Sequence, residues 1–199
     1  MIYLVRHGET VWNLIKRRQG HLDSPLTERG VAQAEALGRC LHGLLNGGVA
    51  HIASSPLGRA MATATIIADH LGIDQENIVA EPLLAEHHMG HWQGLSNTQI
   101  DERFPGARQE RAANKWGYVI PSGESYAQVY DRAVAWLATV PEKQLMITVA
   151  HEMISRTIRG THCHLEPHTM LALNHPHHVI YRLDKGQIEE IMCDQIPTG

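Results

Sequence analysis

Residues 2–10 of the chain read Ile2-Tyr3-Leu4-Val5-Arg6-His7-Gly8-Glu9-Thr10. The apolar run at the start of this stretch predicts a short buried strand, and the charged and small residues after it predict a loop at the strand's carboxyl end. The run is too short for the core of a signal peptide, and no segment of the chain approaches transmembrane length. We therefore expect a strand of a central sheet at residues 2–5 and no association with a membrane.

Strand-like and helix-like segments alternate along the rest of the chain. Apolar runs predict further strands at residues 51–54, 77–80 and 145–150, and a hairpin of residues 178–183 and 187–192. Apolar residues at helical spacing predict helices at residues 27–45, 55–71, 124–138 and 152–159. Ser55 is the expected N-cap of the second helix, and Gly160 is expected to end the last one. This alternation predicts a three-layer α/β/α sandwich with a mostly parallel sheet.

The segment at about 97–122 differs from its surroundings, because it contains Pro105-Gly106, several charges and little periodicity. It predicts a small lid insertion over the main body. No internal repeat or low-complexity linker interrupts the chain, and its 199 residues suit one domain. We expect a single domain over residues 1–199 that carries this lid.

The composition is that of an ordinary globular protein, with 43% hydrophobic and 19% charged residues. A formal net charge of −4 lacks the basic excess of a nucleic-acid-binding protein. The three cysteines form no CxxC pair, which argues against a disulfide framework or a thiolate zinc site and favours a reduced, cytoplasmic protein. The count of fifteen histidines is unusual, and it is compatible with a metal site, a pH switch, catalysis or none of these.

The carboxyl ends of the predicted parallel strands carry a distinctive set of side chains. Arg6 and His7 follow the first strand, Arg59 lies early in the helix after the second, and His151 follows the strand of residues 145–150. Ligands bind at this edge of such sheets. Arginine forms paired, permanently charged hydrogen bonds with phosphate oxygens, and histidine adds a donor or a nucleophile. The set predicts a site for a tetrahedral dianion such as a phosphoryl group.

These residues belong to a series of motifs that extends from residue 1 to about 155. The motifs are Leu4-Val5-Arg6-His7-Gly8-Glu9-Thr10 with Trp12-Asn13, Gln19-Gly20, Asp23-Ser24-Pro25-Leu26-Thr27-Glu28-Arg29-Gly30, Ser54-Ser55-Pro56-Leu57-Gly58-Arg59-Ala60, Leu84-Ala85-Glu86-His87-His88-Met89-Gly90-His91-Trp92-Gln93-Gly94, Pro121-Ser122-Gly123-Glu124-Ser125 and Val149-Ala150-His151. In residues and in order they resemble the histidine phosphatase superfamily, also called the phosphoglycerate-mutase-like family, and within it the phosphatases with an Arg-His-Gly motif.

The resemblance implies a role for each matching residue. His7 would be the nucleophile that forms a phosphohistidine, and Glu86 would protonate the leaving alcohol and then activate water. The residues that would bind the transferred phosphoryl group are Arg6, Arg59 and His151. Those that would line the substrate pocket are Asn13, Gly20 and, as a substrate contact, His87. The resemblance implies no metal and no cofactor, because the arginines supply the positive charge.

Three features depart from the family pattern or allow another interpretation. Glu152 stands where the family has a small residue, and its carboxylate would repel a bound dianion unless the side chain turns away. The run from His151 to Ser155 approaches the HExxH zinc motif but lacks its second histidine. A metal site at His87, His88 and His91 is the weaker alternative. The histidines at positions 162, 164, 168, 175, 177 and 178 are interpreted as surface loop residues.

Three functions are compatible with the sequence. The first is a phosphomonoesterase that hydrolyses a small phosphorylated metabolite through a phosphohistidine. The second is a phosphoglycerate-type mutase, although such mutases follow the glutamate with Arg-His-Tyr-Gly and this chain has His87-His88-Met89-Gly90. The third is a phosphoester-binding module without catalysis, which the intact His7 and Glu86 argue against. The expected partner is a small phosphoester rather than nucleic acid or membrane, and the choice between a monomer and a homodimer stays open.

Overall fold

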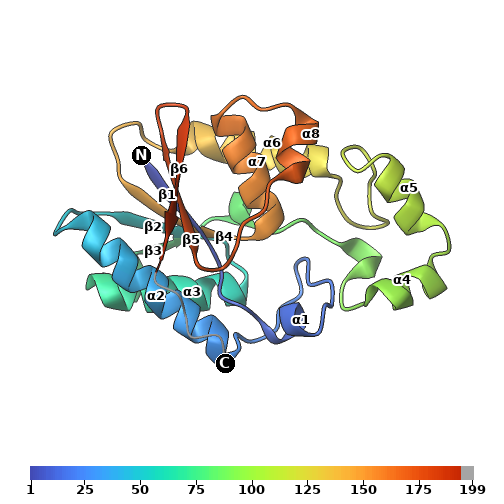
Figure 1. Cartoon of the computed structure of the whole chain (residues 1–199), viewed down its shortest axis with the longest axis horizontal. Helices are drawn as coiled ribbons and strands as arrows, with labels where there is room; N and C mark the ends of the chain where they lie inside the picture. Colours follow the sequence, from blue (N-terminus) through green and yellow to red (C-terminus); the bar gives the residue numbers. More distant parts are fainter. Residues whose placement is uncertain (194–199) are drawn as a thin grey trace.

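A six-stranded sheet with the strand order β3-β2-β4-β1-β5-β6 forms the centre of the computed structural model, which describes residues 1–193 (Figure 1). The last residues of the predicted domain, 194–199, lie outside the described part. Strands β1, β2, β3 and β4 run parallel, and β5 runs antiparallel to both β1 and β6. The predicted strands and the mostly parallel sheet are therefore confirmed. The strands are β1 (Ile2–Arg6), β2 (His51–Ser54), β3 (Ile78–Ala80), β4 (Met146–Ala150), β5 (Val179–Asp184) and β6 (Gln187–Met192).

Helices cover both faces of the sheet, as the alternating side chains of β1 require. Val5 packs with Leu37 in the apolar cluster on one face, whereas Leu4 packs with Trp136 in the cluster on the other. Figure 1 shows α2 and α3 on the first face and α6 and α7 on the second, which confirms the three-layer prediction. These helices are α2 (Glu28–Leu45), α3 (Gly58–Leu71), α6 (Tyr126–Thr139) and α7 (Glu152–His162).

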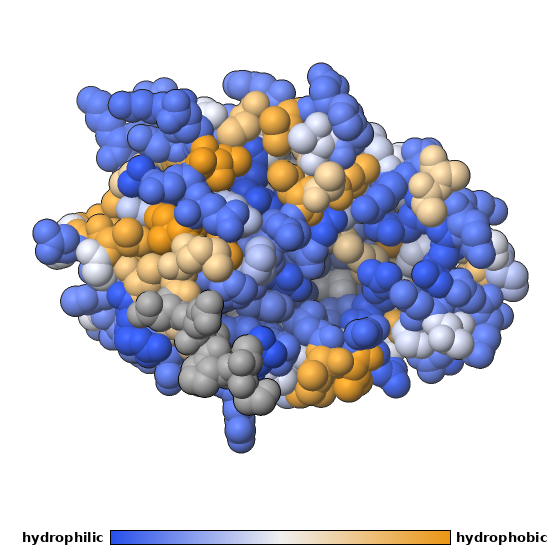
Figure 2. Space-filling model, in the orientation of Figure 1, coloured by the Kyte–Doolittle hydropathy of each residue, from blue (hydrophilic) through white to orange (hydrophobic). Residues whose placement is uncertain are grey.

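The predicted lid contains two short helices and stands beside the sheet at the right of Figure 1. Ile100 and Ile120 pack with Trp92 in a small apolar cluster of their own, apart from the two clusters on the sheet. Figure 2 shows hydrophilic side chains over most of the lid's visible surface, and an apolar patch at the position of α1, where Leu14 and Ile15 are exposed. The remaining helices are α1 (Val11–Leu14), α4 (Asn97–Arg103), α5 (Ala107–Ala113) and α8 (Pro167–Ala172), with 3-10 turns at Gln75–Asn77, Pro82–Leu84 and Gly90–Trp92.

The prediction that Ser55 caps α3 is wrong. The N-cap is Leu57, and no side chain of the cap residue bonds the helix. The carboxylate of Asp23 caps the helix instead, since it accepts hydrogen bonds from the backbone nitrogens of Gly58 (2.5 Å) and Arg59 (3.3 Å). Ser55 is engaged elsewhere, because its hydroxyl lies 2.7 Å from Nε2 of His151.

The prediction that Gly160 ends α7 is also wrong, since the helix continues to His162. A Cβ atom at Gly160 would stand 2.3 Å from the side chain of Met170 in α8. The glycine therefore serves close packing between two helices rather than termination, and α8 itself was not predicted.

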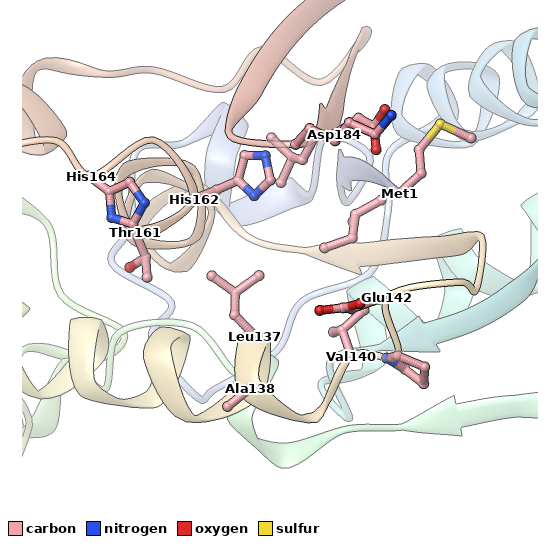
Figure 3. Close-up of a pocket in the computed structure, with 13 residues that line it drawn as sticks. Met1, Leu137, Ala138, Val140, Glu142, Thr161, His162, His164 and Asp184 are labelled. Atoms are coloured by element: carbon pink, nitrogen blue, oxygen red, sulfur yellow. The ribbon is translucent and has the colours of Figure 1, made fainter.

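A cavity of about 660 Å³ opens at the amino end of the sheet, next to Met1 and Asp184 (Figure 3). Its other lining residues include Leu137, Glu142 and His162, so acidic and basic groups are mixed there. None of the predicted site residues lines this cavity. Within residues 1–193, no helix is long and apolar enough to span a membrane.

Candidate active site

The carboxyl edge of the sheet brings the predicted phosphate-binding residues together. His7 follows β1 and His151 follows β4, and their ring centroids are 5.0 Å apart. Arg59 projects from the first turn of α3, and its positive charge acts on both histidines. His7, His151 and Arg59 are each at most 2% exposed. The site is therefore a buried group of basic side chains at the edge where ligands are expected.

The surroundings of His7 favour one tautomer and one charge state of its imidazole ring. Nδ1 lies 2.7 Å from the carbonyl oxygen of Gly8, which can only accept, so Nδ1 carries the proton and Nε2 keeps its lone pair. Burial above all, and then His151 and Arg59, lower the pKa of His7 well below its ordinary value. The ring is consequently neutral at physiological pH, as a nitrogen nucleophile must be.

Glycine is required next to His7. A Cβ atom at Gly8 would stand 2.2 Å from the backbone oxygen of Gly30, and one at Gly30 would stand 2.0 Å from that of Glu9. The loop after β1 and the start of α2 thus meet backbone to backbone, which fixes the loop that carries His7.

Several buried polar atoms around His7 have no protein partner among residues 1–193. They are Nε of Arg6, Nε of Arg59 and Nδ1 of His151. Unpaired buried donors are costly, and a phosphoryl group has the acceptor oxygens to satisfy them. The other nitrogens hold the arginines in place: Arg59 donates to the backbone oxygens of Leu22 (2.9 Å) and Gly20 (2.8 Å), and Arg6 donates to that of His175 (2.9 Å).

Glu152, the departure from the family pattern, turns its carboxylate onto two arginines. One oxygen lies 3.0 Å from Nη1 of Arg6, and the other accepts from Nη2 of Arg156 one helical turn later. The negative charge is thus shared between two cations, which reduces its repulsion of a dianion at Arg6.

Glu86 lies at the amino end of α7, the helix that starts directly after His151. Its carboxylate accepts hydrogen bonds from the backbone nitrogens of His87 (2.9 Å), Met153 (3.2 Å) and Ile154 (3.3 Å). The helix thereby acquires the cap that its own N-cap residue, His151, does not provide. This cap places Glu86, the predicted proton donor, at the same edge of the sheet as His7.

The three residues predicted to line the substrate pocket lie in different environments. The side-chain oxygen of Asn13 accepts from the backbone nitrogen of Thr10 (3.1 Å) in the capping box of α1, so its amide nitrogen is the end that can donate to a ligand. Gly20 has a φ of +56° and holds Arg59 through its carbonyl oxygen. His87 is 0% exposed, with Nε2 donating to the carbonyl oxygen of Glu124 at 2.7 Å and Nδ1 lying 3.3 Å from the sulfur of Met153.

No cluster of three or more His, Cys, Asp or Glu side chains within residues 1–193 is arranged to hold a metal ion. His88 and His91, the other members of the suggested histidine cluster, make different contacts. Nδ1 of His88 accepts from the backbone of Gly90, and Nε2 of His91 lies 3.0 Å from the hydroxyl of Ser122.

Arg132 in α6 holds the loop that carries Glu86, although it lies outside the sequence motifs. Its guanidinium donates to the backbone oxygens of Leu83 and Ala85, each at 2.8 Å, and forms a salt bridge with Glu124 at 2.9 Å. Glu124 in turn accepts from the backbone nitrogen of His88 at 2.9 Å. Arg132 and Glu124 therefore clamp the loop on both sides of Glu86.

We expect Arg132→Met to displace Glu86, the predicted proton donor, while leaving His7 in place. A misplacement of about 1 Å can cost on the order of 100-fold in rate. The loss of kcat should be larger for alkyl phosphates, whose leaving group needs a proton, than for 4-nitrophenyl phosphate. The unpaired Glu124 should also lower the free energy of unfolding by about 2–4 kcal/mol.

Arg182→Met is the matched control, because Arg182 forms a solvent-exposed salt bridge with Glu189 between β5 and β6. This variant should retain the activity and lose less than about 1 kcal/mol of stability. Equal loss of kcat for both leaving groups in folded Arg132→Met would contradict a positioning role toward Glu86.

Comparison with known proteins agrees with this geometry. A model of the histidine phosphatase superfamily (branch 1) matches residues 2–189. The chain belongs to this superfamily. Membership confirms the family expected from the motifs and places the chain among enzymes of the phosphatase type.

Individual relatives support the same family. The chain is 39% identical over 175 residues to a Yersinia pestis protein named "Probable phosphoglycerate mutase GpmB", covering 83% of this chain and 77% of that protein. Among solved structures, the mycobacterial glucosyl-3-phosphoglycerate phosphatase in complex with VO3 is 28% identical, with a TM-score of 0.74 and coverage of 96% of each chain. The α-ribazole phosphatase from Shigella flexneri, at 22% identity, has the same fold with a TM-score of 0.79, over 98% of this chain and 96% of that chain.

Proposed function

We propose that this histidine phosphatase is a metal-independent phosphomonoesterase that hydrolyses a small phosphorylated metabolite through a phosphohistidine. The observation that carries the proposal is the state of His7, a buried neutral imidazole with Nδ1 bound to Gly8 and Nε2 available for attack. The unpaired guanidinium nitrogens of Arg6 and Arg59 beside it suit the equatorial oxygens of a phosphoryl group. We also propose a cytoplasmic location, which the cysteine pattern supports.

The proposed reaction has two displacements at phosphorus. Nε2 of His7 attacks the phosphorus atom, the bond to the ester oxygen breaks, and Glu86 gives its proton to the departing alkoxide. Glu86 then takes a proton from water, whose oxygen attacks the phosphohistidine, and the phosphorus–nitrogen bond breaks to release inorganic phosphate. Arg6, Arg59 and His151 stabilise the charge on the phosphoryl oxygens in both steps.

In the structure the carboxylate of Glu86 accepts hydrogen bonds from backbone nitrogens at the start of α7. These bonds fix the position of the carboxyl group on which both proposed proton transfers depend.

The mutase remains the second candidate, because the Yersinia pestis relative carries a mutase name. The sequence after the glutamate, His87-His88-Met89-Gly90, lacks the arginine of the mutase pattern. In addition, His87 is fully buried with partners at both ring nitrogens, so its ring is not available to a second phosphoryl group. These features favour water over a second substrate alcohol as the acceptor.

Trapping the intermediate tests the proposal. Reaction with a ³²P-labelled phosphoester followed by rapid quenching should yield an acid-labile, alkali-stable phosphoenzyme. Continued turnover should release inorganic phosphate. Absence of the labelled enzyme for every substrate tried would contradict the phosphohistidine route. Transfer of label to a hydroxy-acid acceptor, in preference to water, would instead identify a mutase.

We expect Glu86→Gln to separate the two kinds of leaving group. Glutamine keeps the size of the side chain but has no proton to give, so formation of the phosphoenzyme from an alkyl phosphate should slow by about 10²–10⁴-fold. With 4-nitrophenyl phosphate, whose phenolate leaves unprotonated, that step should change little, although the later attack by water should slow and the phosphoenzyme should accumulate. A uniform loss across leaving groups in pre-steady-state bursts would contradict the role of Glu86 as proton donor.

A further inference from the structure

One of the two ring nitrogens of His151 has a protein partner and the other has none. Nε2 lies 2.7 Å from the hydroxyl oxygen of Ser55, whereas Nδ1 is buried and has no hydrogen-bond partner within residues 1–193. His151 and Ser55 are each 0% exposed, so bulk solvent reaches neither group. The tautomer of His151 therefore decides whether Nδ1 offers a ligand a proton or a lone pair.

The ring of His151 carries a single proton at physiological pH. Burial above all, and then the positive charges of Arg59 and Arg6, lower its pKa well below the ordinary value. In a neutral imidazole one nitrogen is a donor and the other an acceptor. The oxygens of a phosphoryl dianion only accept, so this ring can bind one of them only through the nitrogen that carries the proton.

The hydroxyl group of Ser55 selects that nitrogen. Its oxygen accepts from the backbone nitrogen of Leu57 at 3.3 Å, at the start of α3. Within the described part of the chain, Nε2 of His151 is the one acceptor within reach of the hydroxyl proton. When Ser55 donates to Nε2, the ring proton is on Nδ1. In the opposite tautomer the hydroxyl proton would be buried without an acceptor, which is costly.

The sheet holds Ser55 in the position that this selection requires. The backbone nitrogen of Ser55 donates to the carbonyl oxygen of Val149 in β4 at 2.9 Å. Its carbonyl oxygen accepts from the hydroxyl of Ser54 at 3.0 Å. Ser55 and His151 thus follow two neighbouring parallel strands, β2 and β4, whose register brings the hydroxyl beside the ring.

We propose that Ser55 is a positioning residue, which holds His151 as the tautomer protonated at Nδ1 so that Nδ1 donates to an oxygen of the phosphoryl group. The proposal rests on the proposed phosphatase function. Both histidines of the site then carry their proton on Nδ1, with opposite results. The proton of His7 is bound to Gly8, which leaves Nε2 for attack, whereas the proton of His151 is available to the substrate.

Nitrogen NMR reads the tautomer of His151 without any turnover. In protein labelled with ¹⁵N in histidine, a ring nitrogen that carries a proton and one that carries a lone pair have well-separated chemical shifts. The signals of His151 are those that His151→Gln lacks. Wild type should have the proton on Nδ1, and Ser55→Ala should have a mixture of both tautomers or the Nε2 form.

Either of two spectra would overturn the proposal. The first is a wild-type His151 with its proton on Nε2, a result that needs no variant of Ser55. The second is an unchanged Nδ1 form in Ser55→Ala, which would show that the hydroxyl does not set the tautomer.

A double-mutant cycle measures the consequence for phosphoryl binding. Ser55→Ala should lower kcat/KM for 4-nitrophenyl phosphate and weaken the binding of vanadate by about tenfold or more, because one charge-assisted hydrogen bond is worth about that factor. In the His151→Gln background the same substitution should change both quantities by less than about twofold, because Ser55 acts through His151. A purely structural role of Ser55 would instead cost the same in both backgrounds, and that result would overturn the proposal.

Ser54→Ala is the matched control, since it removes a neighbouring hydroxyl that is equally buried and bonds only a backbone oxygen. It should leave the tautomer unchanged, and kcat/KM and the Kd of vanadate within about twofold of wild type. If Ser54→Ala has the effects of Ser55→Ala, the proposal fails. A wild type that hydrolyses no phosphoester would overturn the proposed function, whereas the spectra and the vanadate cycle would still decide the role of Ser55.

Discussion

His7→Ala is expected to abolish turnover while preserving the binding of oxyanions. The variant lacks Nε2, the atom that would form the bond to phosphorus, and removal of a nucleophile of this kind costs on the order of 10⁴–10⁶ in kcat. The groups that would hold the phosphoryl oxygens do not depend on His7 for their positions. Arg59 is fixed by Leu22 and Gly20, and Arg6 by His175.

Two measurements on the same variant separate chemistry from binding. Steady-state hydrolysis of 4-nitrophenyl phosphate should fall to background, and labelled phosphoenzyme should not form. Calorimetric titration with vanadate should give a Kd within about tenfold of wild type, since the arginines supply most of the attraction. His51→Ala, which removes an exposed histidine at the start of β2, should behave as wild type in both assays. Residual turnover in His7→Ala, or loss of vanadate binding by a folded variant, would contradict the assignment.

The sheet could be predicted because its strands carry their own pattern. In β1 the side chains alternate between two buried faces, so the run is apolar throughout, and Arg6 marks its end. The hairpin was predictable for a similar reason, since Lys185 and Gly186 adopt positive φ values of 47° and 75° in the tight turn that the sequence indicates.

Helix boundaries were less predictable where they depend on distant residues. The start of α3 is fixed by Asp23, 35 residues before Gly58, and Ser55 is drawn away to His151, 96 residues later. Local capping preferences cannot register such partners. The extension of α7 past Gly160 likewise depends on Met170, which belongs to another helix.

The same distinction applies to the residues of the site. Sequence motifs identify some of them, whereas tertiary packing brings in the others. His7, Arg59, Glu86 and His151 were assigned from the family motifs and lie around one edge of the sheet. The supporting residues, such as Arg132, were not found, because an arginine on a helix surface has no local feature that reveals three distant carbonyl partners. Glu124, in contrast, lies in a family motif directly before the capping serine, Ser125. Its charge at that position was the sequence feature that could have identified it as a supporting residue.

Some of the fifteen histidines are buried, and their burial has a physical consequence. The prediction that His175 is a surface residue is wrong, because it is 1% exposed. His7, His151, His175 and His177 lie around the carboxyl edge of the sheet; burial lowers the pKa of the first three well below the ordinary value and that of His177 to about 3. Hydrogen bonds to carbonyl oxygens act in the opposite direction on two of these rings, but burial outweighs them. Nε2 of His175 donates to the carbonyl oxygen of Val179 at 3.2 Å, and Nδ1 of His177 donates to that of His7 at 2.5 Å.

The free energy of unfolding is therefore expected to fall steeply on mild acidification. In the unfolded chain these histidines regain pKa values near 6.5, so below that pH the unfolded state binds protons that the folded state refuses. Stability is fully present above the unfolded pKa and is lost as pH falls below it toward the folded pKa values. Each group contributes up to about 1.4 kcal/mol per pH unit, and the four together at most about 8 kcal/mol between pH 7 and pH 5. A loss of that size approaches the whole stability of a typical domain, about 5–15 kcal/mol.

Urea unfolding at a series of pH values from 7.5 to 5, in buffers without phosphate, measures this loss. The range lies above most carboxylate titrations, so the slope reports chiefly on histidines. His175→Gln removes one buried imidazole outside the proposed chemistry and should reduce the slope below pH 6 by about 1.4 kcal/mol per pH unit, whatever its stability at pH 7.5. His51→Gln removes an exposed imidazole and should leave the slope unchanged. A stability that stays level from pH 7.5 to pH 5, or the same slope in both variants, would show that the buried histidines accept protons without unfolding.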